Sequence, residues 1–305
     1  MKKVLLASVG LFLILILEPL VFMAQQKMLD VPYVPTKYPV VDEMLKLAGV
    51  QKADVVYDLG CGDGRLVVTA AQRYGAKGVG FDIDPERIAE SEENAGKAGV
   101  TALVKFHEQD LFTADFHEAT VMTLYLLTSV NLKLRPKLLR ELRPGTRIVS
   151  HNFGMGEWRP DASSTVDVED ISHEVYLWII PANVSGTWTW TQGKPAASAE
   201  LKIEQVFQLP TGKARVNGKD VGVRDMSLKG DGLSFVLDLP YEDKIVPMTF
   251  EGKAAGHGLA GTIKFVSGGK EIVWDWKARR SPATEKPIDA ERPGGQRGFS
   301  LHRAG

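Results

Sequence analysis

The chain has 305 residues, of which 44% are hydrophobic and 25% charged, an ordinary globular composition that can build a core. This length accommodates one large domain, or a medium domain with a smaller one. The net charge of -1 leaves no basic excess to attract nucleic acid, so we expect no nucleic-acid partner. Cys61 is the single cysteine, which excludes an internal disulfide.

Residues 1–27 have the pattern of a membrane anchor or signal segment. A pair of lysines precedes an apolar run from Val4 to Leu17, and a second apolar patch follows Glu18 and Pro19. A basic start and a short apolar core are typical of a secretory signal, but no clear small-residue cleavage site follows. The whole segment, about 21 residues long, is sufficient to span a bilayer. We therefore expect membrane association, with a secreted or periplasmic protein after signal cleavage as the alternative.

Strands and helices alternate through residues 28–181. Val31–Thr36 is rich in proline and should be extended, and the apolar spacing of Val40–Leu47 predicts a helix that ends at Gly49. The elements that follow are predicted as strand, helix, strand, helix, strand, strand, helix, strand and strand: Val55–Leu59, Arg65–Arg73, Gly78–Asp82, Pro85–Ala98, Leu103–His107, Thr120–Leu127, Leu132–Leu142, Thr146–Asn152 and Glu174–Ile180. This alternation predicts an α/β domain with a doubly wound parallel sheet and a ligand site at the carboxyl ends of its strands.

Beyond Pro181 the apolar pattern changes to period two. Turn pairs such as Asn217-Gly218 separate short alternating segments, so residues 182–280 should form a small antiparallel β-domain, either a barrel or a sandwich. Its tryptophans alternate at i, i+2, which favours core packing over a ligand-binding face: Trp188, Trp190, Trp274 and Trp276. Residues 281–305 are rich in proline, glycine and charge, and we expect a disordered tail.

A glycine-rich turn follows the first predicted strand. The stretch from Asp58 to Arg65 places Gly60, Gly62 and Gly64 at every second position, between a strand and a helix. Glycine lets a nucleoside cofactor approach the backbone without a Cβ in the way, and it permits a tight turn into the helix N-terminus. The position between strand and helix makes this match more specific than the glycine spacing alone.

Three acids fall where a nucleoside cofactor would need them. Asp82 ends the second strand, about 20 residues after the first loop glycine, where an acid accepts hydrogen bonds from ribose hydroxyls. Asp84 is the better cap for the helix that follows. Asp110 can hold an adenine amino group, with Leu111 and Phe112 against the ring, or it is an ordinary turn acid. Asp58 would lie near the positive end of a bound methionine moiety, or it organises the loop.

These residues resemble a known family. Asp58–Arg65 is similar to the first motif of class I S-adenosylmethionine (SAM)-dependent methyltransferases. More specifically, the chain resembles the lysine N-methyltransferases of the ATP synthase c-subunit and of the adenine nucleotide translocase, together with their bacterial relatives. The resemblance runs from about Asp30 to Pro181 and is carried by these segments: Pro32–Thr36, Val55–Arg65, Gly78–Gly80, Asp110–Phe112, Thr123–Leu127, Leu134–Leu142 and Pro144–His151.

The resemblance implies an enzyme that transfers a methyl group from SAM to a nucleophile such as a protein lysine amine. It implies that Tyr33 and Thr36 belong to a cap over the cofactor, and that Leu124–Leu127 replaces the Asn-Pro-Pro-Tyr type motif of amide and adenine methyltransferases. The family usually has proline where Thr128 stands, so the substrate-side loop should differ here. The β-domain lies outside the resemblance. The expected cofactor-binding residues are Tyr33, Thr36, Asp58, Gly60, Gly62, Gly64, Asp82, Asp110, Leu111 and Tyr125.

The chemistry of the sulfonium limits what the protein must supply. Its methyl group is already electrophilic, so the enzyme mainly needs to hold the nucleophile in line. A lysine amine must first lose its proton, which desolvation or a nearby acceptor favours. Tyr125, Asn131 and His151 lie at predicted strand ends near the methyl site and are the candidate catalytic residues, although His151 is better explained as a packed or hydrogen-bonded residue at the strand end than as a proton acceptor. No cluster of His, Cys and Asp has metal-ligand spacing, so we predict no metal.

Three other functions stay open at this point. A small-molecule methyltransferase is an alternative within the same class of enzyme. A noncatalytic envelope protein, with a partner-binding β-domain beside a nucleotide fold, is an alternative from another class. An NAD(P)-dependent dehydrogenase is disfavoured, because the loop glycines do not follow Gly-x-Gly-x-x-Gly and Asp58 suits the methionine end of SAM.

Overall fold

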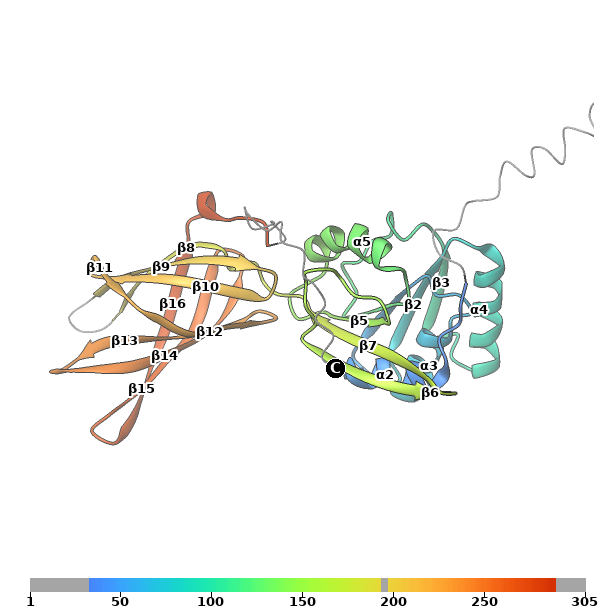
Figure 1. Cartoon of the computed structure of the whole chain (residues 1–305), viewed down its shortest axis with the longest axis horizontal. Helices are drawn as coiled ribbons and strands as arrows, with labels where there is room; N and C mark the ends of the chain where they lie inside the picture. Colours follow the sequence, from blue (N-terminus) through green and yellow to red (C-terminus); the bar gives the residue numbers. More distant parts are fainter. Residues whose placement is uncertain (1–32, 193–196, 289–305) are drawn as a thin grey trace, which may run out of the picture.

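The computed structural model describes residues 33–192 and 197–288, which form two β-sheets, each with its own strands and core (Figure 1). The first sheet has seven strands in the order β3-β2-β1-β4-β5-β7-β6. Its strands are β1 (Val55–Leu59), β2 (Lys77–Asp82), β3 (Val104–Glu108), β4 (Val121–Leu124), β5 (Arg147–His151), β6 (Ala162–Val168) and β7 (Ile171–Ile179). The five strands β3, β2, β1, β4 and β5 are all paired in parallel, and their order along the chain reverses at β1. This arrangement confirms the doubly wound α/β architecture.

Helices cover both faces of this sheet. They are α2 (Tyr38–Leu47), α3 (Arg65–Tyr74), α4 (Pro85–Ala98) and α5 (Thr128–Glu141). Val56, Val121 and Val149 belong to a core with α2 and α3, whereas Tyr57 and Ile148 belong to a second core with α5. Neighbouring residues of a strand point to opposite faces, so the near-continuous apolar runs in β1, β4 and β5 supply both cores.

Local chemistry sets the ends of α4. The side chain of Asp84 accepts a hydrogen bond from the Glu86 N–H at 2.8 Å, Pro85 occupies the first turn, and Gly99 ends the helix in the left-handed conformation. The expected cap at Asp84 is confirmed. In α5, by contrast, Pro136 lies within a helix that begins at Thr128, four residues earlier than predicted.

The prediction of a parallel sheet is wrong at one edge. β7 pairs antiparallel with β5, and β6 pairs antiparallel with β7, so the sheet is mixed. The hairpin turns at Glu169 and Asp170, both of which have positive φ. The exposed polar residues of β6 gave no apolar run, so the sequence pattern did not indicate this strand.

The second sheet has nine strands, all paired antiparallel, in the order β11-β10-β9-β8-β16-β15-β14-β13-β12. They are β8 (Gly186–Gln192), β9 (Ala197–Val206), β10 (Leu209–Val216), β11 (Lys219–Val221), β12 (Val223–Lys229), β13 (Gly232–Tyr241), β14 (Lys244–Ala255), β15 (Gly258–Ser267) and β16 (Lys270–Arg280). β10 and β12 approach each other, so the sheet curls into a nearly closed barrel (Figure 1). This arrangement confirms the antiparallel β-domain.

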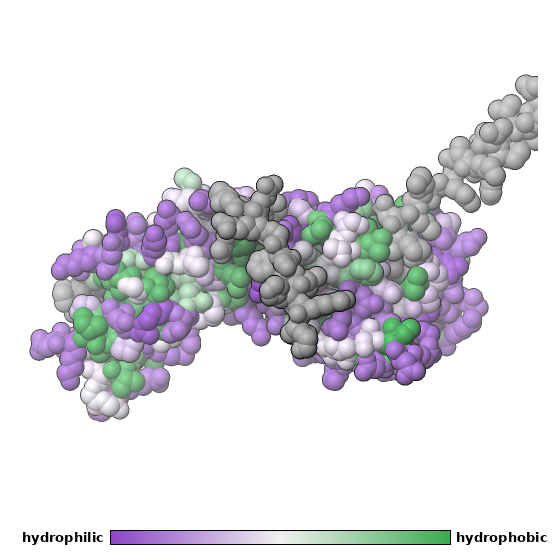
Figure 2. Space-filling model, viewed as in Figure 1, coloured by the Kyte–Doolittle hydropathy of each residue, from purple (hydrophilic) through white to green (hydrophobic). Residues whose placement is uncertain are grey.

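Aromatic side chains fill the interior of the second sheet. Trp190, Phe235, Phe250 and Trp276 pack together, and the rings of Phe235 and Phe250 stack at 4.8 Å. Core packing is thus confirmed for the buried tryptophans, whereas Trp274 is half-buried against the same cluster. Hydrophilic side chains cover most of the visible face of both sheets, with small apolar patches between them (Figure 2).

Two expectations concern the ends of the chain. Residues 1–27, the expected anchor or signal segment, lie outside the described residues. Within the described parts, no helix is long and apolar enough to cross a membrane, and α4 and α5 have 14 residues each, where a span needs about 20. This finding corrects the expectation of a membrane anchor, which no described helix supports. Of the expected disordered tail, residues 281–288 are described and include the short 3₁₀ helix η1 (Pro282–Thr284).

Candidate functional site

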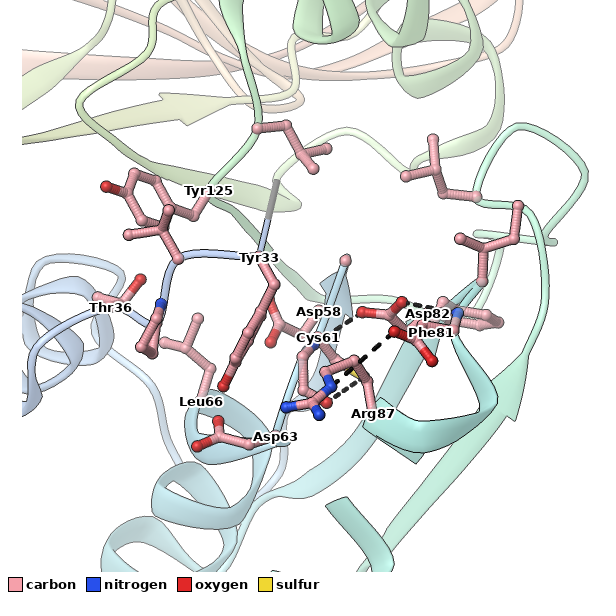
Figure 3. Close-up of a pocket in the computed structure, with 18 of the residues that line it drawn as sticks. Tyr33, Thr36, Asp58, Cys61, Asp63, Leu66, Phe81, Asp82, Arg87 and Tyr125 are labelled. Atoms are coloured by element: carbon pink, nitrogen blue, oxygen red, sulfur yellow. Dashed lines mark hydrogen bonds and ion pairs between the residues drawn. The ribbon is translucent and has the colours of Figure 1, made fainter. Parts of the chain in front are cut away.

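A cavity opens at the carboxyl ends of the first-sheet strands β1, β2 and β4, where a doubly wound sheet places its ligands. It contains about 1080 Å³ of empty space, part of it open to solvent. Tyr33 and Tyr125 lie on one side of this space, and Phe81 and Asp82 on the other (Figure 3). All the expected cofactor-binding residues line the cavity except Gly64.

The glycine loop is tied to the neighbouring strand. The Gly60 and Cys61 N–H groups both donate to the Phe81 carbonyl oxygen, at 2.8 and 2.9 Å. At Gly62, which has φ +54°, an added Cβ would lie 2.3 Å from Cε2 of Tyr33. At Gly64, which has φ +75°, it would lie 2.8 Å from Cε1 of Phe106. Gly62 is therefore needed at the cavity wall, whereas Gly64 serves the packing between the loop and β3.

Asp58 is a buried acid beneath the glycine loop. Its side chain is 3% exposed, and Oδ1 accepts a hydrogen bond from the Thr123 hydroxyl at 2.6 Å. Burial raises the pKa of Asp58 to about 7 despite this hydrogen bond, and the carboxylates of Asp82 and Asp63 add to the rise. A positively charged ligand in the cavity would favour the ionised form.

Asp82 and Asp110 hold the loops at the other end of the cavity. Asp82 is half-buried, and its two carboxylate oxygens accept hydrogen bonds from the N–H groups of Gly62, at 2.9 Å, and Asp84, at 3.0 Å. Asp110 is exposed, and its Oδ1 accepts from the Phe112 N–H at 2.8 Å. Both acids organise backbone turns and also line the cavity, and the adenine-binding role of Asp110 stays a prediction.

A segment before the first strand covers the glycine loop. The Arg65 guanidinium donates to the Thr36 carbonyl oxygen at 2.7 Å and forms an ion pair with Asp63 at 2.5 Å. The guanidinium of Arg87 lies 4.8 Å from the centre of the Tyr33 ring. Sequence reasoning missed Arg87, although its position in the first turn of α4 directs it to the edge of the sheet where the site was expected.

The three candidate catalytic residues differ in their access to the cavity. Tyr125 lines it, and its ring stacks on that of His151 with a centroid distance of 3.8 Å. His151 is 1% exposed, and its two ring nitrogens lie 3.3 Å from the Thr36 hydroxyl and 2.9 Å from Nδ1 of His173. Burial and the neighbouring His173 lower the pKa of His151 to about 4, so its imidazole is neutral at physiological pH.

Asn131 is fully buried and has a structural contact pattern. Its amide donates to the carbonyl oxygens of Phe153, at 3.1 Å, and Gly154, at 3.3 Å. The side chain therefore fastens α5 to the loop after β5, and neither Asn131 nor His151 lines the cavity.

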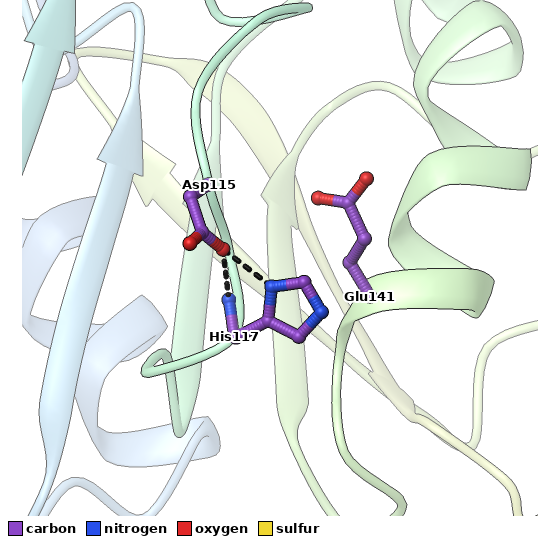
Figure 4. A group of neighbouring side chains, drawn as sticks. All are labelled: Asp115, His117 and Glu141. Carbon is purple, nitrogen blue, oxygen red and sulfur yellow. Dashed lines mark hydrogen bonds and ion pairs between the residues drawn. The ribbon is translucent and has the colours of Figure 1, made fainter.

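A separate group of side chains has ligand atoms within 4.8 Å of one another: Asp115, His117 and Glu141 (Figure 4). The Asp115 carboxylate is hydrogen-bonded to the His117 ring at 2.5 Å. The Glu141 carboxylate accepts from Lys137 at 2.7 Å and Arg140 at 3.1 Å. These interactions account for all three side chains, and the absence of a metal stays a prediction.

Comparisons with known proteins match the first-sheet part of the chain. Residues 58–162 match the model of the ANTKMT methyltransferase domain. A protein-lysine N-methyltransferase of Saccharolobus islandicus is 48% identical over 151 residues, which cover 49% of this chain and 94% of the relative. The human lysine N-methyltransferase of the ATP synthase c-subunit is 30% identical over 179 residues, which cover 59% of this chain and 70% of the relative.

A solved structure is also similar in sequence. It is described as an RNA methyltransferase from Salinibacter ruber in complex with S-adenosyl-L-homocysteine. It is 56% identical, with a TM-score of 0.47, and the match covers 50% of this chain and 96% of the other.

Proposed function

Since this chain belongs to the protein-lysine N-methyltransferase family of SAM-dependent methyltransferases, we propose that it methylates the side-chain amine of lysine residues in a protein. The observation that carries the proposal is the 48% identity to a protein-lysine N-methyltransferase over 94% of its length. The cavity adds chemical support, because its lining suits a positively charged cofactor and a desolvated amine.

The residues present fit SAM. The glycine loop leaves room for a ligand against the backbone, and Asp58 is a buried acid with a raised pKa that a cation would stabilise in its ionised form. We assign the methionine end to Asp58 and Gly60, and the adenosine end to Asp82, Asp110 and Leu111. When bound, SAM supplies an electrophilic methyl group on a sulfonium.

The opposite wall of the cavity suits an amine acceptor. Tyr125, Leu126 and Val130 line it, and the neighbouring Leu127 is 37% exposed. An apolar wall disfavours the charged form of a lysine and so lowers the pKa of its amine. The lower pKa increases the fraction of the neutral, nucleophilic amine. The Tyr125 ring stacks on that of His151, which supports its orientation in this wall. His151 acts here by packing, since it lies behind Tyr125 and outside the cavity lining.

Two measurements, made one after the other, test the proposal. Calorimetry of the full chain should detect SAM binding. Failure to bind SAM would leave a noncatalytic, partner-binding protein as the interpretation, and NADH binding in its place would favour a dehydrogenase. The enzyme is then incubated with a cell extract and SAM that carries a labelled methyl group. The label should appear as Nε-methyl-lysine in protein hydrolysates.

The controls separate the possible acceptors. Label that is lost on ribonuclease treatment, or that passes a small-molecule filter, would contradict lysine methylation while leaving SAM-dependent transfer intact. Asp58→Asn should abolish most of the labelling. Asp115→Asn, the same change at an exposed site outside the cavity, should leave the labelling unchanged.

A further inference from the structure

The turn between β9 and β10 places a buried aromatic ring outside its own sheet. Phe207 is 5% exposed, yet it packs in the α5-side core of the first sheet. Its ring stacks on that of Trp158, with centroids 5.7 Å apart and an angle of 13°. Its backbone has φ +52°, a conformation that costs energy for a bulky residue and persists only where the surroundings enforce it.

Polar contacts fasten the same hairpin to the loop between β5 and β6. The Gln208 side chain donates to the Arg159 carbonyl oxygen at 2.7 Å. The guanidinium of Arg135, on α5, lies 5.1 Å from the centre of the Phe207 ring and donates to the Met155 carbonyl oxygen at 2.9 Å. The hairpin therefore contacts both this loop and α5.

The β5–β6 loop leads directly to the acceptor wall of the cavity. Asn131 holds the Phe153 and Gly154 carbonyl oxygens, and the Ser150 hydroxyl donates to the Phe153 carbonyl oxygen at 2.7 Å. The Phe153 ring lies 6.0 Å from that of Tyr125, which lines the cavity. A continuous set of contacts thus runs from Phe207 to the wall assigned to the methyl acceptor.

The residues assigned to the cofactor are held in another way. The glycine loop is bonded to β2, and the segment at Thr36 is bonded to Arg65, although the Thr36 hydroxyl also lies 3.3 Å from Nδ1 of His151 at the end of β5. Removal of Phe207 should therefore disturb the acceptor wall and leave the glycine loop, Asp58 and Asp82 in place.

We propose that Phe207 is a positioning residue, through which the second sheet holds the acceptor wall of the methyltransferase site in its working geometry. The identification of this wall with the methyl acceptor rests on the proposed function, whereas the coupling between the hairpin and the β5–β6 loop does not. The second sheet contributes this coupling to a methyltransferase domain whose matched relatives cover only about half of the chain.

Hydrogen exchange of the full chain tests the coupling without a known acceptor. In Phe207→Ala, amides of residues 126–131 and 152–159 should exchange at least ~10-fold faster, since local opening becomes easier when the anchor is lost. Amides of residues 58–66 should not change, and the SAM affinity should stay within about twofold, because binding free energy changes little where contacts are untouched. Leu209→Ala is the matched control, since Leu209 lies in the same hairpin and is 56% exposed.

Further variants keep the inference decidable. If Phe207→Ala does not fold, Phe207→Leu, which keeps apolar volume but loses the stack, and Arg135→Gln are compared in the same way. Unchanged exchange in the β5–β6 loop of a folded variant would overturn the inference. A loss of SAM affinity as large as the loss of acceptor binding would also overturn it. Once a lysine acceptor is identified, its KM should rise at least ~5-fold in Phe207→Ala while the KM for SAM holds, the mark of lost ground-state positioning.

Discussion

Asp58 combines a buried position with an excess of negative charge around it. The residue is 3% exposed and shares the cavity with Asp63, Asp82 and Asp110. The Thr123 hydroxyl satisfies one oxygen but supplies no positive charge. A cofactor that carries a sulfonium and an ammonium group would supply it, so we expect Asp58 to contribute to SAM affinity mainly through charge.

Asp58→Asn should lower SAM affinity roughly 10-fold or more, because a hydrogen bond to a charged group contributes about 1.5–3 kcal/mol. The side chain keeps its shape and can still pair with Thr123, so the fold should persist. Calorimetric titration with SAM measures the effect, and Asp115→Asn controls for a change of net charge. An unchanged affinity would show that Asp58 only organises the loop.

The raised pKa of Asp58 also predicts a pH dependence of the unliganded protein. The native carboxyl keeps its proton up to about pH 7, whereas an unfolded aspartate releases it near pH 4. Between these values the native state binds more protons, so Asp58 makes the free energy of unfolding fall as pH rises. Asp58→Asn should therefore gain stability relative to the unmodified chain from about pH 4 to about pH 7. Urea unfolding across this range checks the sign, and parallel curves would contradict it.

The segment of residues 33–36 shows how one element depends on another. It has no strand or helix of its own, and it is held by Arg65 at the start of α3 and by the contact of Tyr33 with Gly62. Because the glycine has no side chain, the tyrosine ring lies directly on the loop. This segment can therefore cover a ligand only if the loop keeps its glycine.

Gly62→Ala should displace Tyr33 and lower SAM affinity at least ~10-fold, since its Cβ would fall 2.3 Å from the tyrosine ring. The positive φ adds about 1 kcal/mol of strain. Gly99→Ala is the matched control, because Gly99 has φ +69° and no heavy atom within 4 Å of an added Cβ. Both variants should lose similar stability in thermal unfolding, and only the first should lose affinity. If the two variants bind SAM with equal affinity, Tyr33 does not belong to the cofactor site.

On the scale of the whole molecule, the two sheets have separate cores that meet at Phe207. The aromatic cluster of the second sheet includes Phe235, Phe250 and Trp276, none of which contributes to the first sheet's cores. The second sheet should consequently unfold in a step of its own, while the hairpin contact transmits part of the effect to the first.

Phe235→Ala should destabilise the second sheet by about 3–5 kcal/mol, the usual cost of removing a buried aromatic ring. Phe235 is fully buried and stacks on Phe250. Scanning calorimetry should show one transition shifted to lower temperature, with SAM still bound by the first sheet. Val273→Ala, at a 51% exposed position, is the control. Loss of SAM binding together with a single common transition would show that the two sheets fold as one unit.

The sequence alone predicted the alternating α/β unit, the change to period two after Pro181, the cap at Asp84 and the glycine loop. These features depend on short stretches of chain, because periodicity, turn residues and caps act within a few residues. The ligand site followed from the same local patterns, since the carboxyl ends of parallel strands meet at one edge of a sheet.

Other features depended on segments far apart in the chain. The antiparallel β6–β7 edge, the burial of His151 against Tyr125 and Thr36, and the insertion of Phe207 beside Trp158 come from tertiary contacts. The raised pKa of Asp58 likewise depends on burial by several elements. The sequence therefore determined which motifs the chain carries, and the tertiary structure decided which of their side chains reach the cavity, because burial and partners are set by residues distant in sequence.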